Sequence, residues 1–538
     1  MNTLRNNKLG LFIPITLAVI ISVSCGYFAG SRLSRKHPLY FGNKIDAILS
    51  IIDQQYVDTV NIRQLIETAA TNLVNELDPH SRLISVEELQ SVTDNLEGSF
   101  SGIGVSFTTP SDTILITSVI SGGPAEKVGI LPFDRIITID DSTFAGKNIT
   151  DTQIMRTLRG AKNTRVKLGI RRGNSPELIY FEVTRGDVPN YSIDVSYALG
   201  EIGYIRVNSF ARTTYNEFIT ALAKLRNEGC NSYIVDLRGN RGGYLDVAIR
   251  MANEFLPSSR LIVYMEGNAY KRQNFYADGN GSFQQAPFVV LVDELSGSAS
   301  EVFAGTIQDN DRGLIIGRRT YGKGLVQNSI QLDDGSELRL TVARYYTPSG
   351  RCIQKLYEMG KSEEYDQDLN IRYRHGEFYI ADSIKMDESL KFTTLNGRMV
   401  YGGGGIMPDL FIPLDTSNIT SYYDAVINSG ALYQFVLEYS ERNHPKLSAY
   451  KSYEDLYAYL KQQPLVEEFT DYAEAKGIRK RPTLIRISWD MMETAIHAYI
   501  VRNFFDSAGF YPIFQKDDTT ILQALRVLRD GTWKPDVS

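Results

Sequence analysis

The chain has 538 residues, of which 43% are hydrophobic and 22% are charged, an ordinary composition for a globular protein. This length exceeds what one hydrophobic core can organise, so we expect roughly three or four domains. The formal net charge of −6 gives no argument for nucleic-acid binding, and the three cysteines have no spacing that predicts a disulfide framework or a metal site.

The first predicted element is an apolar segment. Residues 9–29 are almost entirely apolar and are flanked by five basic residues, Arg5, Lys8, Arg32, Arg35 and Lys36. About 20 residues can span a bilayer, and this is long for the apolar part of a signal peptide. Basic residues flank both sides, so their distribution does not set the orientation. We expect an uncleaved anchor within residues 1–36, with the rest of the protein outside the cytoplasm. A cleaved signal and lipid attachment at Cys25 are the alternatives.

A helical segment is predicted next. Apolar residues recur at helical spacing over residues 44–77, and this stretch ends in Leu-Asp-Pro-His-Ser at residues 77–81. We expect helical structure over residues 43–95.

The following region, residues 97–185, contains a glycine-rich loop. This loop consists of Gly102, Ile103, Gly104 and Val105 and resembles the carboxylate-binding loop of PDZ domains. The N–H groups of such a loop bind the C-terminal carboxylate of a peptide. Motifs at 122–126 and 134–137 fit the later helix and strand of a PDZ domain. We expect a PDZ domain at residues 96–187, with a β-rich spacer as the alternative.

Strands and helices then alternate. Strands are predicted at 202–207, 233–237, 288–292 and 314–316, and helices at 215–226 and 244–256. Such alternation predicts a layered, largely parallel α/β core. A glycine pair, Gly242 and Gly243, follows the second strand, where backbone N–H groups can bind an anion. The lack of a G-x-G-x-x-G sequence argues against a dinucleotide-binding domain.

A serine stands where the strand at 288–292 turns into a helix. Ser298 lies among small residues, and a nucleophilic serine is usually exposed to its substrate at such a strand-to-helix turn. The strand at 314–316 leads to Lys323, which has a glycine on each side. Glycines let the backbone approach a neighbouring site closely.

A nucleophilic serine needs a base. None of the five histidines has an obvious acid partner, so a Ser-His-Asp triad has little support. Lys323 can serve if burial lowers its pKa from roughly 10.4 towards 7, which costs about 4 kcal/mol. Alternatively, Ser298 only caps the helix and Lys323 is a solvated loop residue.

Residues 317–324 also have the G-x-x-x-x-G-K spacing of a phosphate-binding loop. The next position should be Ser or Thr to bind magnesium, and it is Gly324. This argues against a nucleotide site.

The segments SGSASE (296–301), AGTIQD (304–309) and GRRTYGKGLVQ (317–327) resemble the catalytic signature of the carboxyl-terminal processing proteases, also called tail-specific proteases. The resemblance implies that Ser298 is the nucleophile and Lys323 its general base, and their separation of 25 residues fits the family. It also implies that Gln327 orients the lysine and that Asp309 has a supporting role.

The resemblance extends over residues 43–413. It implies that Gly242 or Gly243 supplies one oxyanion donor and Ala299 the other. Residues 77–81 match the segment before the PDZ domain of this family, which gives His80 a structural role. Phe133 stands where the family has glycine, so this turn is expected to differ. No metal, nucleotide or other cofactor is implied.

The rest of the chain carries no chemistry that we identify. Alternation across residues 326–342 predicts a hairpin, and the polar residues 358–387 are expected to leave the core. Amphipathic helices are predicted at 431–439, 453–460 and 491–505, where they pack on the core or form an oligomer contact.

The sequence thus predicts an α/β protein with a crotonase/ClpP-like protease core at 188–415, an inserted PDZ domain, and helical N- and C-terminal regions, the latter at 416–538. We expect a serine endopeptidase acting on proteins with free apolar C-termini. Residues 9–29 would anchor it in the inner membrane, facing the bacterial periplasm, and a homo-oligomer is compatible with the sequence. A catalytically silent PDZ adaptor is the alternative from another class, and a Ser-His-Asp esterase is a weaker one.

Overall fold

The structure is a computed structural model that describes residues 42–173 and 175–534. The chain divides into two compact units, residues 1–73 and 74–538. The described part of the first unit holds α2 (Gly42–Gln55) and most of α3 (Ile62–Asn75). Within the described ranges, no helix combines the length and apolar character that a membrane crossing requires. The predicted anchor at 9–29 lies outside the described residues.

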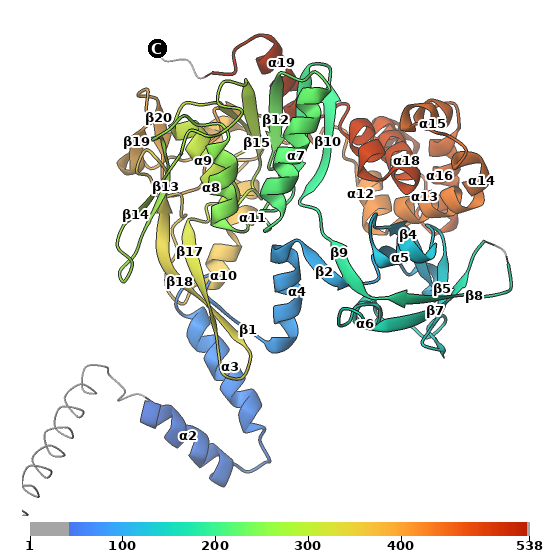
Figure 1. The fold of residues 1–538 in the computed structure, drawn as a ribbon, viewed down its shortest axis with the longest axis horizontal. Coiled ribbons are helices and arrows are strands. Elements are labelled where there is room, and N and C mark those ends of the chain that lie inside the picture. Colours follow the sequence, from blue (N-terminus) through green and yellow to red (C-terminus); the bar gives the residue numbers. More distant parts are fainter. Residues whose placement is uncertain (1–41, 174, 535–538) are drawn as a thin grey trace, which may run out of the picture. The chain divides into compact units, whose positions relative to one another are not determined.

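A six-stranded sheet forms the centre of the second unit (Figure 1). Its strands, in spatial order, are β10 (Ile193–Leu199), β11 (Ile202–Val207), β12 (Ser232–Asp236), β15 (Phe288–Val292), β16 (Leu314–Gly317) and β21 (Leu410–Phe411). All neighbours pair in parallel except β10 and β11. The inner strands β15 and β16 carry no polar side chain along their whole length, as is typical of strands that are covered on both faces. The predicted largely parallel α/β core is confirmed.

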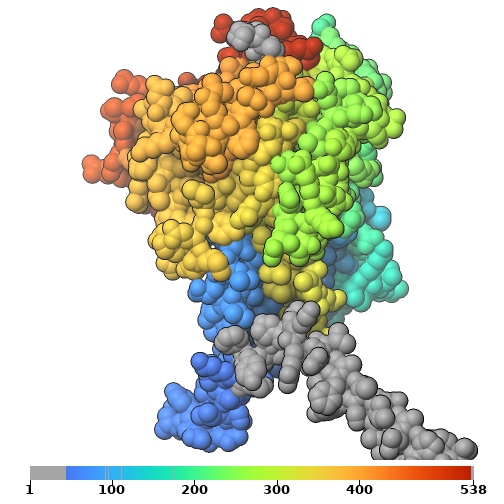
Figure 2. Space-filling view, turned by 90° about the vertical axis from the view of Figure 1, so that its left-hand side faces the viewer, coloured from blue at the N-terminus to red at the C-terminus, as the bar shows by residue number. Residues whose placement is uncertain are grey.

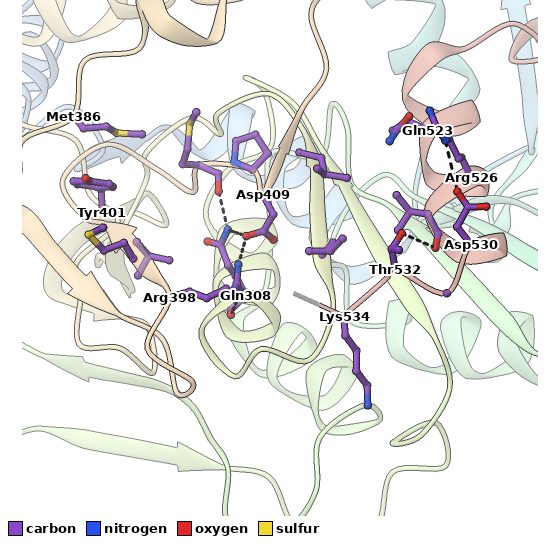
Figure 3. Close-up of a pocket in the computed structure, with 18 of the residues that line it drawn as sticks. Gln308, Met386, Arg398, Tyr401, Asp409, Gln523, Arg526, Asp530, Thr532 and Lys534 are labelled. Carbon is purple, nitrogen blue, oxygen red and sulfur yellow. Dashed lines mark hydrogen bonds and ion pairs between the residues drawn. The ribbon is translucent and has the colours of Figure 1, made fainter. Parts of the chain in front are cut away.

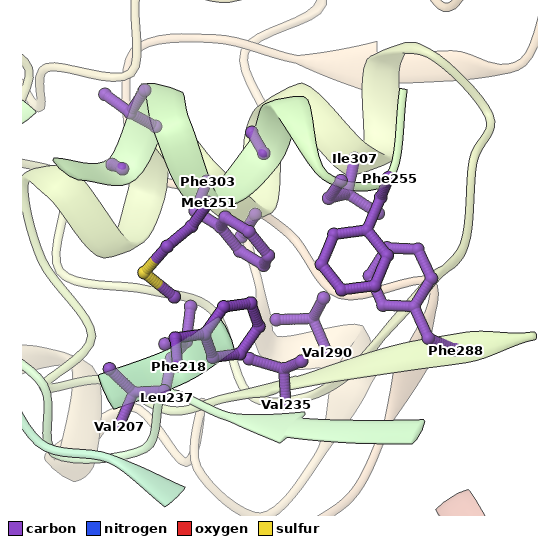
Figure 4. Packing of buried hydrophobic residues seen from close by; sticks show 14 of the residues in the cluster. Val207, Phe218, Val235, Leu237, Met251, Phe255, Phe288, Val290, Phe303 and Ile307 are labelled. Atoms are coloured by element: carbon purple, nitrogen blue, oxygen red, sulfur yellow. The ribbon is translucent and has the colours of Figure 1, made fainter. Parts of the chain in front are cut away.

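One face of this sheet is covered by helices α7 (Thr214–Asn227), α8 (Leu245–Asn253) and α9 (Ala299–Asp309). Side chains alternate between the two faces of a strand, so Val290 packs beneath these helices. Figure 4 shows the aromatic centre of this layer, where the rings of Phe255 and Phe288 stack with centroids 4.1 Å apart. The packing fixes the start of α9, which follows the candidate nucleophile.

The opposite face is covered by the C-terminal helix α19 (Thr519–Arg529). Ile521 and Leu525 pack there against Val289 and Leu291. The end of the chain therefore completes the core, although it lies in the region 416–538 that was predicted to be an extension.

A second, five-stranded sheet carries the segments around Lys323. It consists of β1 (Arg82–Ile84), β18 (Glu337–Tyr346), β13 (Leu261–Glu266) and β14 (Gln273–Tyr276), with β17 (Leu325–Gln331) on β18. Strands β17 and β18 are antiparallel, which confirms the predicted hairpin. Strand β1 joins the other edge of β18 and brings residues 78–81 to this sheet.

The PDZ region has its own sheet and core. The sheet consists of β3 (Val105–Thr108), β4 (Ile114–Val119), β5 (Arg135–Ile139), β7 (Arg165–Arg171) and β8 (Ile179–Thr184), with β6 (Ser142–Thr143) on β5. Its helices are η2 (Pro110–Asp112), α5 (Pro124–Val128) and α6 (Asp151–Leu158). Helix α4 (Val86–Glu97) and the two-stranded ribbon of β2 (Ser99–Gly102) and β9 (Gly186–Pro189) connect it to the core.

The segment between β18 and β21 packs back onto the core, so the prediction that residues 358–387 within it leave the core is wrong. It contains α10 (Ser362–Asp366), α11 (Asp368–Arg374), η3 (Ala381–Ser383), η4 (Glu388–Leu390), β19 (Lys391–Thr393) and β20 (Met399–Tyr401). Tyr365 and Arg372 are buried, and Arg372 donates to the backbone carbonyls of Arg319 and Thr320. Figure 2 shows this segment, yellow to orange, forming a large part of one face.

Seven helices form a separate hydrophobic core before α19. They are α12 (Ser421–Asn428), α13 (Ala431–Arg442), α14 (His444–Leu447), α15 (Tyr453–Leu460), α16 (Leu465–Ala475), α17 (Pro482–Ile487) and α18 (Trp489–Phe514). The predicted helices at 431–439, 453–460 and 491–505 are confirmed. Helix α18 bends at Phe505 and Asp506, whose backbone angles are not helical.

Candidate active site

Ser298 lies between β15 and the first turn of α9 in a strained conformation. Its φ of 56° and ψ of −115° lie in a region that residues other than glycine rarely adopt. A sharp strand-to-helix turn of this kind exposes a serine hydroxyl at the end of a sheet. Its backbone N–H donates to Glu301 Oε2 at 2.8 Å, which helps to hold the turn.

Glu301 is a buried carboxylate that the sequence analysis missed. Its Oε2 accepts the N–H groups of Ser298 and Lys323, each at 2.8 Å. Its Oε1 accepts the N–H of Gly322 at 2.7 Å and the hydroxyl of Thr320 at 2.5 Å. Burial raises the pKa of Glu301 to about 7 in spite of these four donors. The Ser-x-x-Glu spacing of a helix capping box was the signal that could have revealed it.

Lys323 is partly buried, and its Nζ donates to Gln327 Oε1 at 3.3 Å. Desolvation lowers its pKa below the ordinary value, and the positive charges of Arg339 and Arg82 act in the same direction. Asp78 and Glu301 oppose them. The lysine is therefore easier to deprotonate than a solvated one, which a general base requires.

Gln327 is held in turn by His80, whose backbone carbonyl accepts a hydrogen bond from Gln327 Nε2. Burial and the neighbouring Lys323 lower the pKa of His80 to about 3, so its ring is neutral near pH 7. The structure thus brings Lys323, Gln327 and His80 together. In the described residues no hydrogen bond joins the Ser298 hydroxyl to Lys323, and their backbones meet at Glu301 instead.

The glycine pair lies against the Ser298 turn. A Cβ on Gly242 would stand 2.7 Å from the Cβ of Ser298 and 3.0 Å from the backbone N of Ala299, so only glycine fits there. The N–H of Gly242 donates to Asn240 Oδ1 at 2.9 Å. It is therefore already engaged, which favours Gly243 over Gly242 as an oxyanion donor beside Ala299.

Asp309 lies at the opposite end of α9 from Ser298. A rise of about 1.5 Å per residue separates the two by roughly 16 Å. Both Asp309 and Arg351 are buried, and they form an ion pair at 2.7 Å; Asp309 also accepts the N–H of Ser349 at 3.1 Å. Any influence of Asp309 on catalysis must therefore be indirect, either through α9 or through the segment that contains Ser349 and Arg351.

A cavity of about 1000 Å³ also opens near this far end of α9 (Figure 3). Its polar side chains pair with one another, as Gln308 does with Asp409 at 2.9 Å and Arg526 with Asp530 at 3.6 Å. It does not adjoin the Ser298 turn, and we do not place the chemistry there. Within residues 42–173 and 175–534, no group of His, Cys, Asp and Glu side chains is arranged to bind a metal ion.

The predicted peptide-binding loop packs against the start of α5. The carbonyl of Ile103 accepts the N–H of Ala125 at 2.7 Å, and that of Gly104 accepts the N–H of Ile120 at 3.0 Å. A Cβ on Gly104 would stand 3.3 Å from Gly123 Cα, so glycine permits this close approach. Gly102 is buried in the same loop, and Val105 begins strand β3.

Comparison with known proteins identifies the core. Peptidase family S41 matches residues 201–359, and the PDZ domain matches residues 101–183. A "Probable CtpA-like serine protease" of Staphylococcus aureus (strain MRSA252) is 30% identical over 391 residues, which are 70% of this chain and 76% of that protein. The chain belongs to peptidase family S41.

The comparisons found further similarities. The "Probable CtpA-like serine protease" of Staphylococcus haemolyticus (strain JCSC1435) is 31% identical, over 65% of this S41 chain and 70% of that protein. The solved photosystem II D1 C-terminal processing protease is 27% identical over 58% of this chain and 90% of its own, with a TM-score of 0.33. Residues 422–506 match a family of unknown function, DUF8443.

The protein is therefore a CtpA-like serine peptidase with a PDZ domain and an α/β core, as the sequence predicts. The roles of individual site residues stay predictions.

Proposed function

We propose that this S41 peptidase hydrolyses peptide bonds with a Ser298–Lys323 dyad. The main support is that the backbones of both residues are bound to one oxygen of Glu301, while burial lowers the pKa of Lys323. The strained backbone of Ser298 and the contact between Lys323 and Gln327 are consistent with these roles.

In the proposed reaction, neutral Lys323 removes the proton from Ser298 Oγ as that oxygen attacks the carbonyl carbon of the scissile bond. The N–H groups of Gly243 and Ala299 stabilise the resulting oxyanion. The protonated lysine then gives its proton to the leaving amine, and the acyl-enzyme forms. Lys323 next activates a water molecule, which attacks the ester carbonyl and releases the shortened product.

Ser298→Ala and Lys323→Ala should each lower kcat/KM by at least about a thousandfold while the melting temperature stays close to that of the wild type. Lys323→Arg should be equally inactive, because arginine stays charged. Ser329→Ala and Lys361→Ala are matched controls outside the site and should retain activity. Substantial turnover by a folded Ser298→Ala or Lys323→Ala variant would exclude the dyad.

We also propose that the PDZ domain selects substrates by a free, apolar C-terminus. The support is the sequence and packing of the loop at residues 102–105, next to strand β3, which can pair with an added peptide strand. Amidating a substrate tail should raise the substrate concentration needed for half-maximal rate, because a charge-assisted contact is lost. Equal cleavage of free and amidated tails at low concentration would contradict this.

We propose that residues 9–29 anchor the protein in the inner membrane, with the rest of the chain outside the cytoplasm. Their length and apolar character support a membrane span, whereas the basic residues on both sides do not set its orientation. The protein should then stay in the membrane fraction after a high-salt wash, and mature protein that begins near Arg32 would instead establish cleavage.

A further inference from the structure

The two neighbours of Lys323 are held by one short segment. Gln354 Oε1 accepts the N–H of Gly324 at 2.8 Å, and the N–H of Lys355 donates to the carbonyl of Gly322 at 2.9 Å. The position of the Lys323 backbone therefore depends on Gln354 and Lys355 as well as on Glu301.

The side chain of Lys323 is held by a different part of the chain. It contacts Gln327, which is bound by the backbone carbonyl of His80. The segment around His80 is fixed on β18, because Asp78 accepts the hydroxyl of Thr341 at 3.0 Å.

One buried side chain joins these two supports. The hydroxyl of Tyr365 lies 2.9 Å from His80 Nε2 and 3.3 Å from Gln354 Nε2. Its ring meets that of His80 edge to face, with centroids 5.2 Å apart, and the ammonium of Lys355 lies 3.9 Å from its centroid. Tyr365 is 5% exposed and comes from α10, in the segment that packs back onto the core.

The directions of these hydrogen bonds are mutually consistent. Burial raises the pKa of Tyr365, so its hydroxyl keeps its proton, and His80 is neutral and can accept it. Gln354 Nε2 can only donate. The hydroxyl therefore accepts a hydrogen bond from Gln354 and donates one to His80. In neither contact does a donor face a donor or an acceptor face an acceptor.

We propose that Tyr365 is a positioning residue for the general base, because its hydroxyl ties the His80–Gln327 support of the Lys323 side chain to the Gln354 support of the Lys323 backbone. Tyr365 touches neither substrate nor Ser298 in this role. The inference rests on the proposed dyad and adds to it a residue outside the catalytic segments.

Tyr365→Phe removes one oxygen and keeps the ring contacts. It leaves His80 Nε2 and one N–H of Gln354 without their partner. A less firmly held His80–Gln327 support should leave Lys323 better hydrated, which should raise the pKa of the lysine toward its ordinary value. The other charged groups around Lys323, namely Asp78, Arg82, Glu301 and Arg339, are unchanged.

The test measures kcat per active site, counted with a serine-reactive fluorophosphonate, over a range of pH. Tyr365→Phe should lower kcat by about tenfold at neutral pH, with KM changed by less than about twofold, and its acid limb should move to higher pH. Tyr373→Phe, in the same segment but half exposed, is the matched control and should match the wild type. A purely structural role predicts fewer active sites and a lower melting temperature, with kcat per site and the acid limb unchanged, and would overturn the proposal.

His80→Phe provides a second route if Tyr365→Phe does not fold. It removes the acceptor Nε2 but keeps the backbone carbonyl that binds Gln327, and it should move the acid limb in the same direction. The double variant should be no worse than the poorer single variant, since both remove one bond. Additive effects would contradict the proposal. Lys323→Ala separates the dyad from the positioning role of Tyr365. An active Lys323→Ala variant would refute the dyad. If Lys323→Ala is inactive but Tyr365→Phe has the kcat and pH profile of the wild type, only the role of Tyr365 is refuted.

Discussion

Ser298 and Lys323 donate their backbone N–H groups to the same oxygen atom, Oε2 of Glu301, each at 2.8 Å. The candidate nucleophile starts a helix and the candidate base follows a separate strand. Their relative position is therefore set by a buried carboxylate, in addition to the packing of β15 and β16. The same carboxylate also accepts hydrogen bonds from Thr320 and Gly322, so it holds the backbone segment that leads to Lys323.

Glu301→Gln should lower kcat by roughly 10- to 100-fold, because a glutamine offers one acceptor oxygen to four donors. Glu294→Gln is the matched control, since Glu294 is paired with Arg318 at 2.6 Å in the preceding loop. The comparison requires steady-state kinetics with counted active sites. An unchanged kcat in Glu301→Gln would show that the shared carboxylate does not position the dyad.

The same substitution has a pH signature in stability. Burial raises the pKa of Glu301 from 4.5 to about 7, so between these values the folded chain retains a proton that the unfolded chain has released. The contribution of this group to the free energy of unfolding therefore falls as pH rises from about 4.5 to about 7. As pH rises over this range, the melting temperature of the wild type should fall relative to that of Glu301→Gln. A constant difference would contradict the raised pKa.

Asp309→Ala should act on stability more than on chemistry. It leaves the fully buried Arg351 without its carboxylate partner, and breaking a buried pair in this way costs about 3–5 kcal/mol. Urea titration should show this loss, while kcat per active site should fall far less than in Ser298→Ala. Equal loss of kcat per site in a folded Asp309→Ala variant would give Asp309 a direct catalytic role.

The sequence predicted the parts of the site that lie in short contiguous segments. Ser298 and Lys323 each stand among small residues after a buried strand, and that local pattern is visible without a structure. Tyr365 could not be found in this way, because its partner His80 is 285 residues away and the intervening polar segment has no periodicity that places it. Helix α19 was not among the predicted helices, and an amphipathic pattern alone would not say which sheet face it covers.

Phe133 stands where the family has glycine, and the structure shows what its side chain contacts. It has a φ of 68°, where glycine would be unstrained, and its ring lies against Leu437 and Phe504 of the helical region. Nearby, Arg135 pairs with Glu441 at 2.7 Å. The side chain thus fills a contact between the PDZ sheet and the C-terminal helices.

Phe133→Gly should therefore loosen that contact although it relieves backbone strain. Strain at one such residue is of order 1–3 kcal/mol, and loss of a buried phenyl group costs about 3–5 kcal/mol, so the net effect is destabilising. Hydrogen exchange should increase at the backbone of α13 near Leu437. Leu131→Ala, at a half-exposed neighbour, is the control. Unchanged exchange in Phe133→Gly would show that the contact does not depend on this ring.

Asp518 couples the end of the chain to the loop of the glycine pair. Its carboxylate binds Arg238 at 2.8 Å, and Arg238 is also bound to the buried Asp236 at 2.7 Å. Arg238 lies four residues before Gly242, in the loop that contacts the Ser298 turn. Asp518 also caps α19 by accepting the N–H groups of Thr520 and Ile521.

Asp518→Asn separates the charge from the cap, because asparagine caps a helix about as well as aspartate. The variant should keep α19 in place. Asp236 alone would then face two positive charges, those of Arg206 and Arg238, and this imbalance should lower the free energy of unfolding by about 1–3 kcal/mol. If the oxyanion loop depends on this pair, kcat per active site should also fall by several-fold, with little change in KM. Asp517→Asn removes a neighbouring exposed carboxylate and should leave both quantities unchanged. A loss of stability without any change in kcat would limit the role of Asp518 to holding α19 on the sheet, and no loss of either would show that Arg238 is sufficiently neutralised by Asp236 alone.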